Sequence, residues 1–174
     1  DTGSVYWASA GAGLLQRERC TDLSSKEQNW HAIQIWINLP ACQKKKPPSL
    51  YLCSAEQVPI VHRGHARVRI LCGSYEGVKA KIQSFVPTTL LHVSLEKGEW
   101  AIPQLSETVL LYALSGPLRL NERSMQGGEW TILSSKEKHS LCGSGSFLLL
   151  SGEPLHEPIA RQSGFVMNSK AELE

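Results

Sequence analysis

Three short apolar runs decide the fold class of this chain: TLLHVSL at residues 89–95, TVLLYAL at 108–114 and SFLLLS at 146–151. Each run has the length of a β-strand and is bounded by turn-forming residues. Further strands are expected at 33–39, 66–72, 80–86, 117–121 and 129–133. The turn signals are Gly73-Ser74, Lys97-Gly98, Ser115-Gly116, Gly127-Gly128 and Gly143-Ser144-Gly145. Many short strands separated by glycine favour an all-β antiparallel sandwich or barrel.

The composition is that of a globular protein without a strong electrostatic preference. Of the 174 residues, 41% are hydrophobic and 20% are charged, and the net charge is +2. No apolar run approaches the roughly 20 residues that span a bilayer. The five cysteines are odd in number and form no CxxC, which favours free thiols in a reducing compartment. We therefore expect a soluble, cytoplasmic protein, nuclear if the source is a eukaryote, with no direct nucleic-acid binding and no membrane contact.

Residues 33–39 alternate apolar and polar side chains with the period of a strand. Ile33, Ile35 and Ile37 are expected to face a core, and Gln34 and Asn38 to face away from it. The run Lys44-Lys45-Lys46, just before Pro47-Pro48, is expected to be a solvated loop.

Few residues suggest chemistry. His62 and His65 could supply half of a metal site, but a solvated loop is the favoured interpretation because such sites need three or four ligands. His92 alternates with apolar neighbours and is expected to be a satisfied histidine on a strand. Gln16 and Glu18 lie two apart, so on a strand both would face one way. Gln is a poor iron ligand, and one carboxylate does not hold a transition metal alone.

Six motifs resemble those of a known family. They are GSVYWASAGAG at 3–13, QRE at 16–18, IQIWINLP at 33–40, VRILCG at 68–73, GEPLHEPI at 152–159 and FVMN at 165–168. The last three follow the order and spacing of the pirin family of bicupins, and the resemblance extends over nearly the whole chain. It implies a cupin-like antiparallel β-barrel or jelly roll, with extra N-terminal strands left from a second cupin.

The resemblance also implies an iron site that is incomplete here. In the family, an N-terminal barrel resembles a dioxygenase site of three His and one Glu, with iron or another divalent transition metal. Two His belong to an HxH motif upstream of this sequence, and the others to an HSE motif. Gln16 stands at the His of HSE, so only Glu18 remains as a vestigial ligand. We therefore expect no catalytic residue and no cofactor. Whether the chain is an enzyme stays open: the incomplete ligand set favours a non-catalytic protein, and any activity would be that of a quercetinase-like dioxygenase.

The expected organisation has four parts. Residues 1–40 are a remnant of the N-terminal cupin, 41–65 a linker, 66–168 the C-terminal barrel and 169–174 the start of a truncated helix. The leading hypothesis is a non-catalytic binding or regulatory module that contacts a protein partner, or a second copy of itself, through its N-terminal strands. The alternatives are a fragment of an iron-dependent quercetin 2,3-dioxygenase and a barrel that binds a small, possibly aromatic, ligand.

Overall fold

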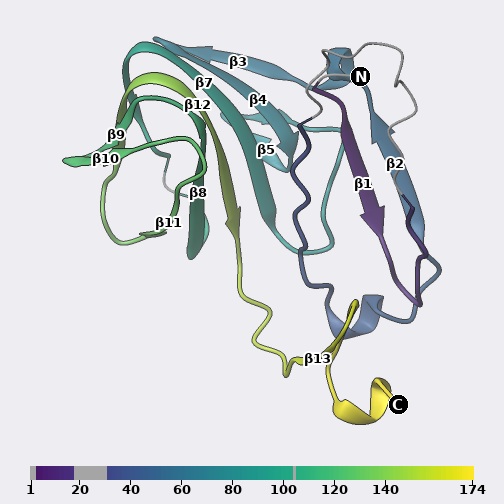
Figure 1. The fold of residues 1–174 in the computed structure, drawn as a ribbon. Helices are drawn as coiled ribbons and strands as arrows, with labels where there is room; N and C mark the ends of the chain where they lie inside the picture. Colours follow the sequence, from purple (N-terminus) through teal and green to yellow (C-terminus); the bar gives the residue numbers. More distant parts are fainter. Residues whose placement is uncertain (1–2, 18–30, 104) are drawn as a thin grey trace, which may run out of the picture. The chain divides into compact units, whose positions relative to one another are not determined.

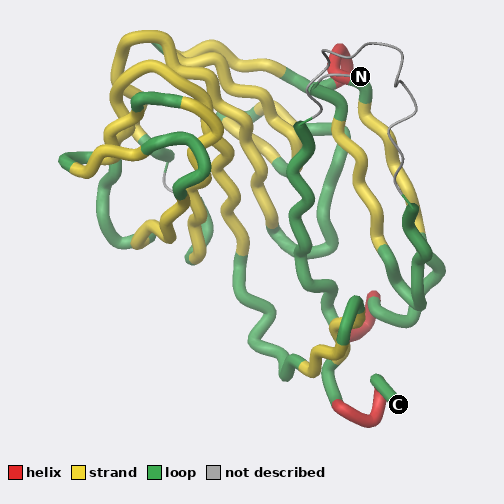
Figure 2. Tube along the Cα trace, in the orientation of Figure 1, coloured by secondary structure: helices red, strands yellow, loops and turns green. Residues whose placement is uncertain are grey.

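The computed structural model describes residues 3–17, 31–103 and 105–174, and it is almost entirely β-structure (Figures 1 and 2). The chain divides into two compact units, Asp1–Ala8 with Leu50–His156 and Ser9–Ser49 with Glu157–Glu174. The strands are β1 Val5–Ser9, β2 Ser49–Cys53, β3 Ile60–Arg63, β4 Ala66–Cys72, β5 Ser74–Tyr75, β6 Val78–Lys79, β7 Thr88–Ala101, β8 Thr108–Ser115, β9 Leu118–Leu120, β10 Arg123–Met125, β11 Trp130–Ser134, β12 Ser140–Gly152, β13 Ala160–Gln162 and β14 Phe165–Met167. The 3-10 helices are η1 Ala41–Gln43, η2 Ala55–Gln57 and η3 Lys170–Glu172.

The first unit is built on an eight-stranded antiparallel sheet. Its two longest strands, β7 and β12, pair along their lengths (Figure 1). On the far side of β7 follow β4 and β3, while the other edge of β12 is shared between β9 and β8. The all-β antiparallel architecture expected from the strand pattern is confirmed, as is the cupin-like fold that the family resemblance implied. No helix among the described residues is long and apolar enough to cross a bilayer.

The core of this unit comes from the alternating residues of the same strands. Val68 and Ile70 of β4, Leu91 and Val93 of β7, and Leu149 of β12 are fully buried. Trp100 closes one part of the core, with its ring centroid 5.6 Å from that of Phe147 and 6.4 Å from that of Tyr75. Such tilted aromatic pairs contribute beyond their buried area.

Two glycine-containing segments that were expected to be turns lie inside long strands. Lys97-Gly98 belongs to β7 and Gly143-Ser144-Gly145 to β12, and the pairing of these strands shifts register between Gly143 and Gly145. The glycines permit close backbone approach here: a Cβ on Gly143 would lie 2.4 Å from the Pro117 carbonyl oxygen. The turn assignment was wrong because glycine marks a β-bulge as well as a turn.

Two expected strands are absent. Residues 31–40 and 80–86 have no regular secondary structure (Figure 2). The predicted facing of 33–39 is only partly correct: Gln34 is exposed and Ile35 and Ile37 are half-buried, but Ile33 is exposed. The Asn38 Oδ1 atom, predicted to face away from the core, is buried and has no hydrogen-bond partner among the described residues. Alternation alone does not make a strand, since the backbone of a strand needs a neighbour to pair with. Trp36, on the predicted polar side, is 61% exposed.

In the second unit, the carboxylate of Glu157 joins three of the sequence motifs. Its Oε2 atom accepts hydrogen bonds from the Ala41 backbone N–H at 2.8 Å and from Asn168 Nδ2 at 2.9 Å. Asn168 Nδ2 also donates to the Pro158 carbonyl at 3.0 Å. The segment after IQIWINLP, the GEPLHEPI motif and the FVMN motif therefore meet at one acidic side chain. The domain boundaries expected at residues 40, 65 and 168 stay a prediction.

Candidate functional site

The residues expected at the vestigial metal site are only partly described. Gln16 has an exposed side chain and lies in a stretch without regular secondary structure, and Glu18 lies outside the described residues. Among the described residues, no group of three or more His, Cys, Asp or Glu side chains is placed to hold a metal ion. Of the two possible metal ligands in the QRE motif, the structure therefore describes only Gln16, whose side-chain amide is exposed.

The histidines near the barrel have structural roles. His62 is exposed, and His65 packs its ring against Gly98, where a Cβ would come within 2.4 Å of it. His92 is half-buried on β7 and faces Arg69 of β4, with 3.4 Å between Nδ1 and Arg69 Nη1. A guanidinium only donates, so Nδ1 accepts and the proton sits on Nε2. Burial lowers the pKa of His92, and Arg69 and Arg67 lower it further.

Arg69 is a buried cation that sequence reasoning missed. Only 9% of it is exposed, and its Nη2 donates to the Gly3 carbonyl. Burial lowers the pKa of its guanidinium, and the neighbouring Arg67 adds to that effect. The sequence of residues 66–72, ARVRILC, could have indicated this position. Its two arginines alternate with core residues and therefore share one face of the strand.

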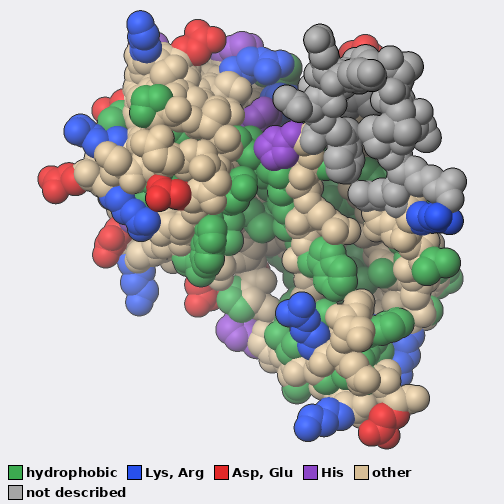
Figure 3. All heavy atoms as spheres, viewed as in Figure 1, with side chains coloured by type: hydrophobic (Ala, Val, Ile, Leu, Met, Phe, Trp, Pro, Cys, Tyr) green, Lys and Arg blue, Asp and Glu red, His purple; other side chains and the backbone are tan. Residues whose placement is uncertain are grey.

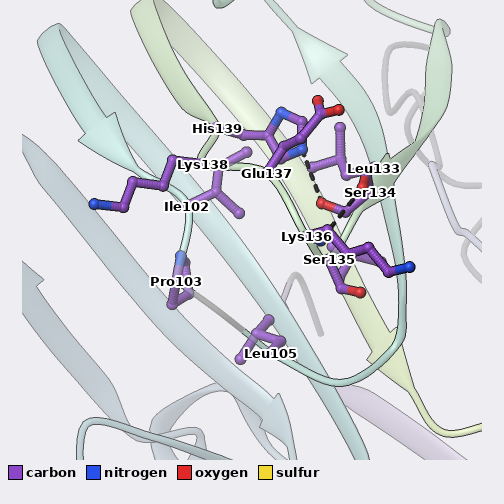
Figure 4. Close-up of a pocket in the computed structure, with 11 residues that line it drawn as sticks. Ile102, Pro103, Leu105, Leu133, Ser134, Ser135, Lys136, Glu137, Lys138 and His139 are labelled. Carbon is purple, nitrogen blue, oxygen red and sulfur yellow. Dashed lines mark hydrogen bonds between the residues drawn. The ribbon is translucent and has the colours of Figure 1, made fainter.

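A small pocket lies between the segment after β7 and the segment that joins β11 to β12 (Figure 4). Its volume is about 150 Å³, and its apolar lining comes from Ile102, Pro103, Leu105, Val109 and Leu133. The other side is formed by residues 134–139, where the side chains of Lys136 and Lys138 extend in opposite directions (Figure 4).

His139 lines this pocket with its ring held on both sides. Nε2 lies 3.0 Å from the Ser134 carbonyl, and Nδ1 lies 3.3 Å from Asn121 Nδ2. The amide orientation follows from Asn121 Oδ1, which accepts from the Ser140 backbone N–H at 3.0 Å. His139 is therefore the neutral tautomer with its proton on Nε2, and both ring nitrogens are already used. The His139 ring therefore contributes an aromatic surface to the pocket rather than a free hydrogen-bonding group.

The two-stranded sheet β1–β2 presents apolar side chains to solvent. Leu50 is 56% and Leu52 67% exposed on one side of β2, and Tyr51 is exposed on the other. Tyr6 of β1 is also exposed. Figure 3 shows how hydrophobic side chains lie among polar ones on the face that it draws.

The lysine run is solvated as expected at Lys45 and Lys46, which are exposed, but not at Lys44. Lys44 is only 4% exposed and its Nζ has no hydrogen-bond partner among the described residues, whereas Lys45 pairs with Glu172 at 3.3 Å. The prediction failed at Lys44 because a charge run alone does not show which side chain the fold covers. The thiols of Cys42, Cys53, Cys72 and Cys142 are free, and burial raises the pKa of Cys72 to about 11, which makes it a poor nucleophile.

The antiparallel β-architecture of the first unit defines a cupin-type protein. Residues 90–174 match the family model of the pirin C-terminal cupin domain. The chain is 29% identical over 183 residues to Pirin-1 of Arabidopsis thaliana, covering 99% of this chain and 62% of the relative. It is 31% identical over 188 residues to a putative quercetin 2,3-dioxygenase of Vibrio cholerae, covering 99% and 64%.

A solved structure of similar fold is the quercetin 2,3-dioxygenase from Acinetobacter baumannii. It superposes with a TM-score of 0.85 at 28% identity, covering 99% of this chain and 63% of that chain. Along nearly its whole length the chain is similar to proteins named pirin or pirin-like, and its C-terminal half matches the pirin C-terminal cupin domain. It spans a little over three fifths of the length of the first curated relatives it matches.

The donors described here do not fit the iron site implied by the family. That site takes its third histidine from the position of Gln16, and a glutamine amide is a weaker ligand for a transition metal than an imidazole. The side chain of Gln16 is also exposed and lies outside regular structure. No catalytic step through iron is therefore derived for this chain.

Proposed function

We propose that this pirin-type chain acts as a non-catalytic binding module whose contact surface is the β1–β2 sheet. The observation that supports the proposal is the exposure of apolar side chains on both faces of β2, namely Leu50 and Leu52 on one face and Tyr51 on the other. Solvated strands normally present polar residues on at least one face. A short sheet with two apolar faces is a typical contact surface.

The partner we propose is a second copy of the same chain. Within the described residues, β1 and β2 pair only with each other. Each strand therefore has one edge whose backbone N–H and C=O groups do not pair with another described strand. Such an edge pairs with another strand through backbone hydrogen bonds, without a catalytic or charged side chain. A symmetric dimer would use the same patch twice, which suits a largely apolar surface without charged side chains on its two strands.

Sedimentation velocity over a wide range of protein concentration tests this proposal. The parent chain is expected to associate as concentration rises, and Leu52→Lys is expected to remain monomeric because it places a charge in the contact. Ile132→Lys is the matched control: Ile132 is similarly exposed in the same unit but lies on β11. A parent chain that stays monomeric at the highest concentration would rule out self-association.

The pocket of Figure 4 supports a second candidate function, the binding of a small apolar or aromatic molecule. Its volume of about 150 Å³ is below that of typical drug-sized sites, so the ligand would be small. Titration with indole, followed by the amide NMR signals of residues 133–139, tests this candidate. Saturable shifts that disappear in Leu105→Trp, which fills the pocket, would support it. Shifts that persist unchanged in that variant would contradict it.

A further inference from the structure

Two arginines and two histidines share one face of the sheet formed by β3, β4 and β7. Arg67 and Arg69 alternate with the fully buried Val68 and Ile70, so both face away from the core. The strand register places His92 opposite Arg69, and His62 opposite Arg67. All four positions belong to the same compact unit.

The positive charge of this group has no described counter-charge. The ion pairs between described residues are Arg63–Glu76 and Lys45–Glu172, and neither includes Arg67 or Arg69. Arg69 is nevertheless buried, with only 9% of it exposed, and among the described residues its hydrogen bonds go to the neutral Gly3 carbonyl and the His92 ring. A buried guanidinium is costly unless an anion compensates it, because the protein interior solvates charge poorly.

The remaining hydrogen-bond donors of the group converge on the same face. A guanidinium carries five N–H groups, and the contacts of Arg69 account for two of them. His92 accepts through Nδ1 and therefore keeps an Nε2–H donor, for which the structure shows no acceptor. Arg67, two residues along β4, is exposed and able to turn its guanidinium toward a ligand. Arginine is suited to oxyanions because its planar fork donates two parallel hydrogen bonds.

We infer that this outer face of β4 and β7 binds a phosphate group, held by the guanidinium groups of Arg67 and Arg69 and by the Nε2–H group of His92. A phosphate dianion matches the two guanidinium charges, which a single carboxylate does not. The ligand class is a small phosphate monoester or phosphate itself. This inference does not depend on the association proposed for β1–β2.

Titration with inorganic phosphate at constant ionic strength tests the site, with the arginine Nε–H signals in ¹H–¹⁵N NMR spectra as the readout. Saturable shifts are expected for Arg67 and Arg69. Arg67→Gln should weaken phosphate binding by at least about tenfold, which corresponds to the loss of one charge-assisted hydrogen bond. This variant removes an exposed side chain, so the fold is expected to remain intact.

Arg119→Gln is the matched control, because Arg119 is an exposed arginine on β9 of the same unit. It should bind phosphate as the parent does, and acetate at the same ionic strength should bind the parent at least about tenfold more weakly than phosphate. Equal losses in the Arg67 and Arg119 variants would mean non-specific charge attraction and would overturn the site. Shifts that never saturate, or equal affinity for acetate, would overturn it as well.

Discussion

His92 shows how one buried cation changes the chemistry of its neighbour. Arg69 approaches the ring from β4, and burial together with the two arginines lowers the pKa of the imidazole. In the unfolded chain the imidazole has its ordinary pKa of about 6.5. The folded chain therefore binds fewer protons than the unfolded chain once the pH falls below that value.

This difference predicts a pH dependence of stability. The contribution of neutral His92 is fully present above pH about 6.5 and is lost progressively as the pH falls through the lower folded pKa, because the unfolded state then binds the extra proton. Urea unfolding between pH 5 and 7.5, compared for the parent chain and His92→Gln, measures it. The variant should show a shallower loss of unfolding free energy on acidification. Parallel curves for the two proteins would contradict the assignment.

Leu149 tests the core at the residue scale. It is fully buried on β12, so Leu149→Ala should lower the free energy of unfolding by about 2–5 kcal/mol through lost burial and the cavity left behind. Ile132→Ala, at an exposed position of β11, should change it by no more than about 0.5 kcal/mol. Denaturant unfolding measures both, and similar losses would show that the core lies elsewhere.

At the scale of elements, β12 organises the barrel by changing partners along its length. Residues 141–143 pair with β9, and residues 146–152 pair with β8. The change occurs at Gly143-Ser144-Gly145, where the backbone passes close to residues 115–117. Between Gly143 and Gly145 the paired strand β7 advances by three residues, from Gly98 to Leu95, so the extra residue of this β-bulge belongs to β7. A bulge bends the ladder and increases its twist, and β12 changes partner at this bend.

Gly143→Ala is expected to disrupt this change of partner. The glycine has φ +124°, and an added Cβ would lie 2.4 Å from the Pro117 carbonyl oxygen. Strain and overpacking together should lower the free energy of unfolding by roughly 2–4 kcal/mol. Gly164→Ala is the control, since a Cβ there meets nothing within 4 Å and the backbone is not left-handed. If the denaturation midpoint of the Gly143 variant equals that of the Gly164 control, the close approach at Gly143 does not contribute to stability.

At the scale of the whole molecule, the similarity to pirin proteins raises the question of whether this chain binds a metal. Relatives of similar sequence and fold are named quercetin 2,3-dioxygenases, while this chain has Gln16 at the position of the motif's histidine. We predict less than one iron per chain in protein purified without chelator, measured by elemental analysis. Gln16→His should not restore stoichiometric iron, because this substitution does not supply the two histidines of the family's HxH motif. Stoichiometric iron in the parent chain would contradict the prediction.

The sequence by itself determined the barrel strands with strong local patterns. The runs at 66–72, 89–95, 108–114 and 146–151 all lie in strands β4, β7, β8 and β12, because their apolar residues have no alternative to burial in a shared core. The assignment of Gln16 to the histidine position of the family motif rests on the resemblance of residues 16–18 and stays a prediction. Arg67 and Arg69 could have been assigned to one face from their spacing.

Only the tertiary structure decided what those patterns left open. Residues 33–39 alternate as a strand does and yet form none, because a strand exists only where another backbone completes its hydrogen bonds. The same sequence signal, glycine, lies beside a β-bulge at 143–145 and in a turn at 127–128, and the strands that lie alongside decide between the two. The burial of Arg69 and Lys44, and the pocket beside His139, depend on segments distant in sequence. Local patterns record what a residue prefers, whereas burial and pairing depend on what the rest of the chain places next to it.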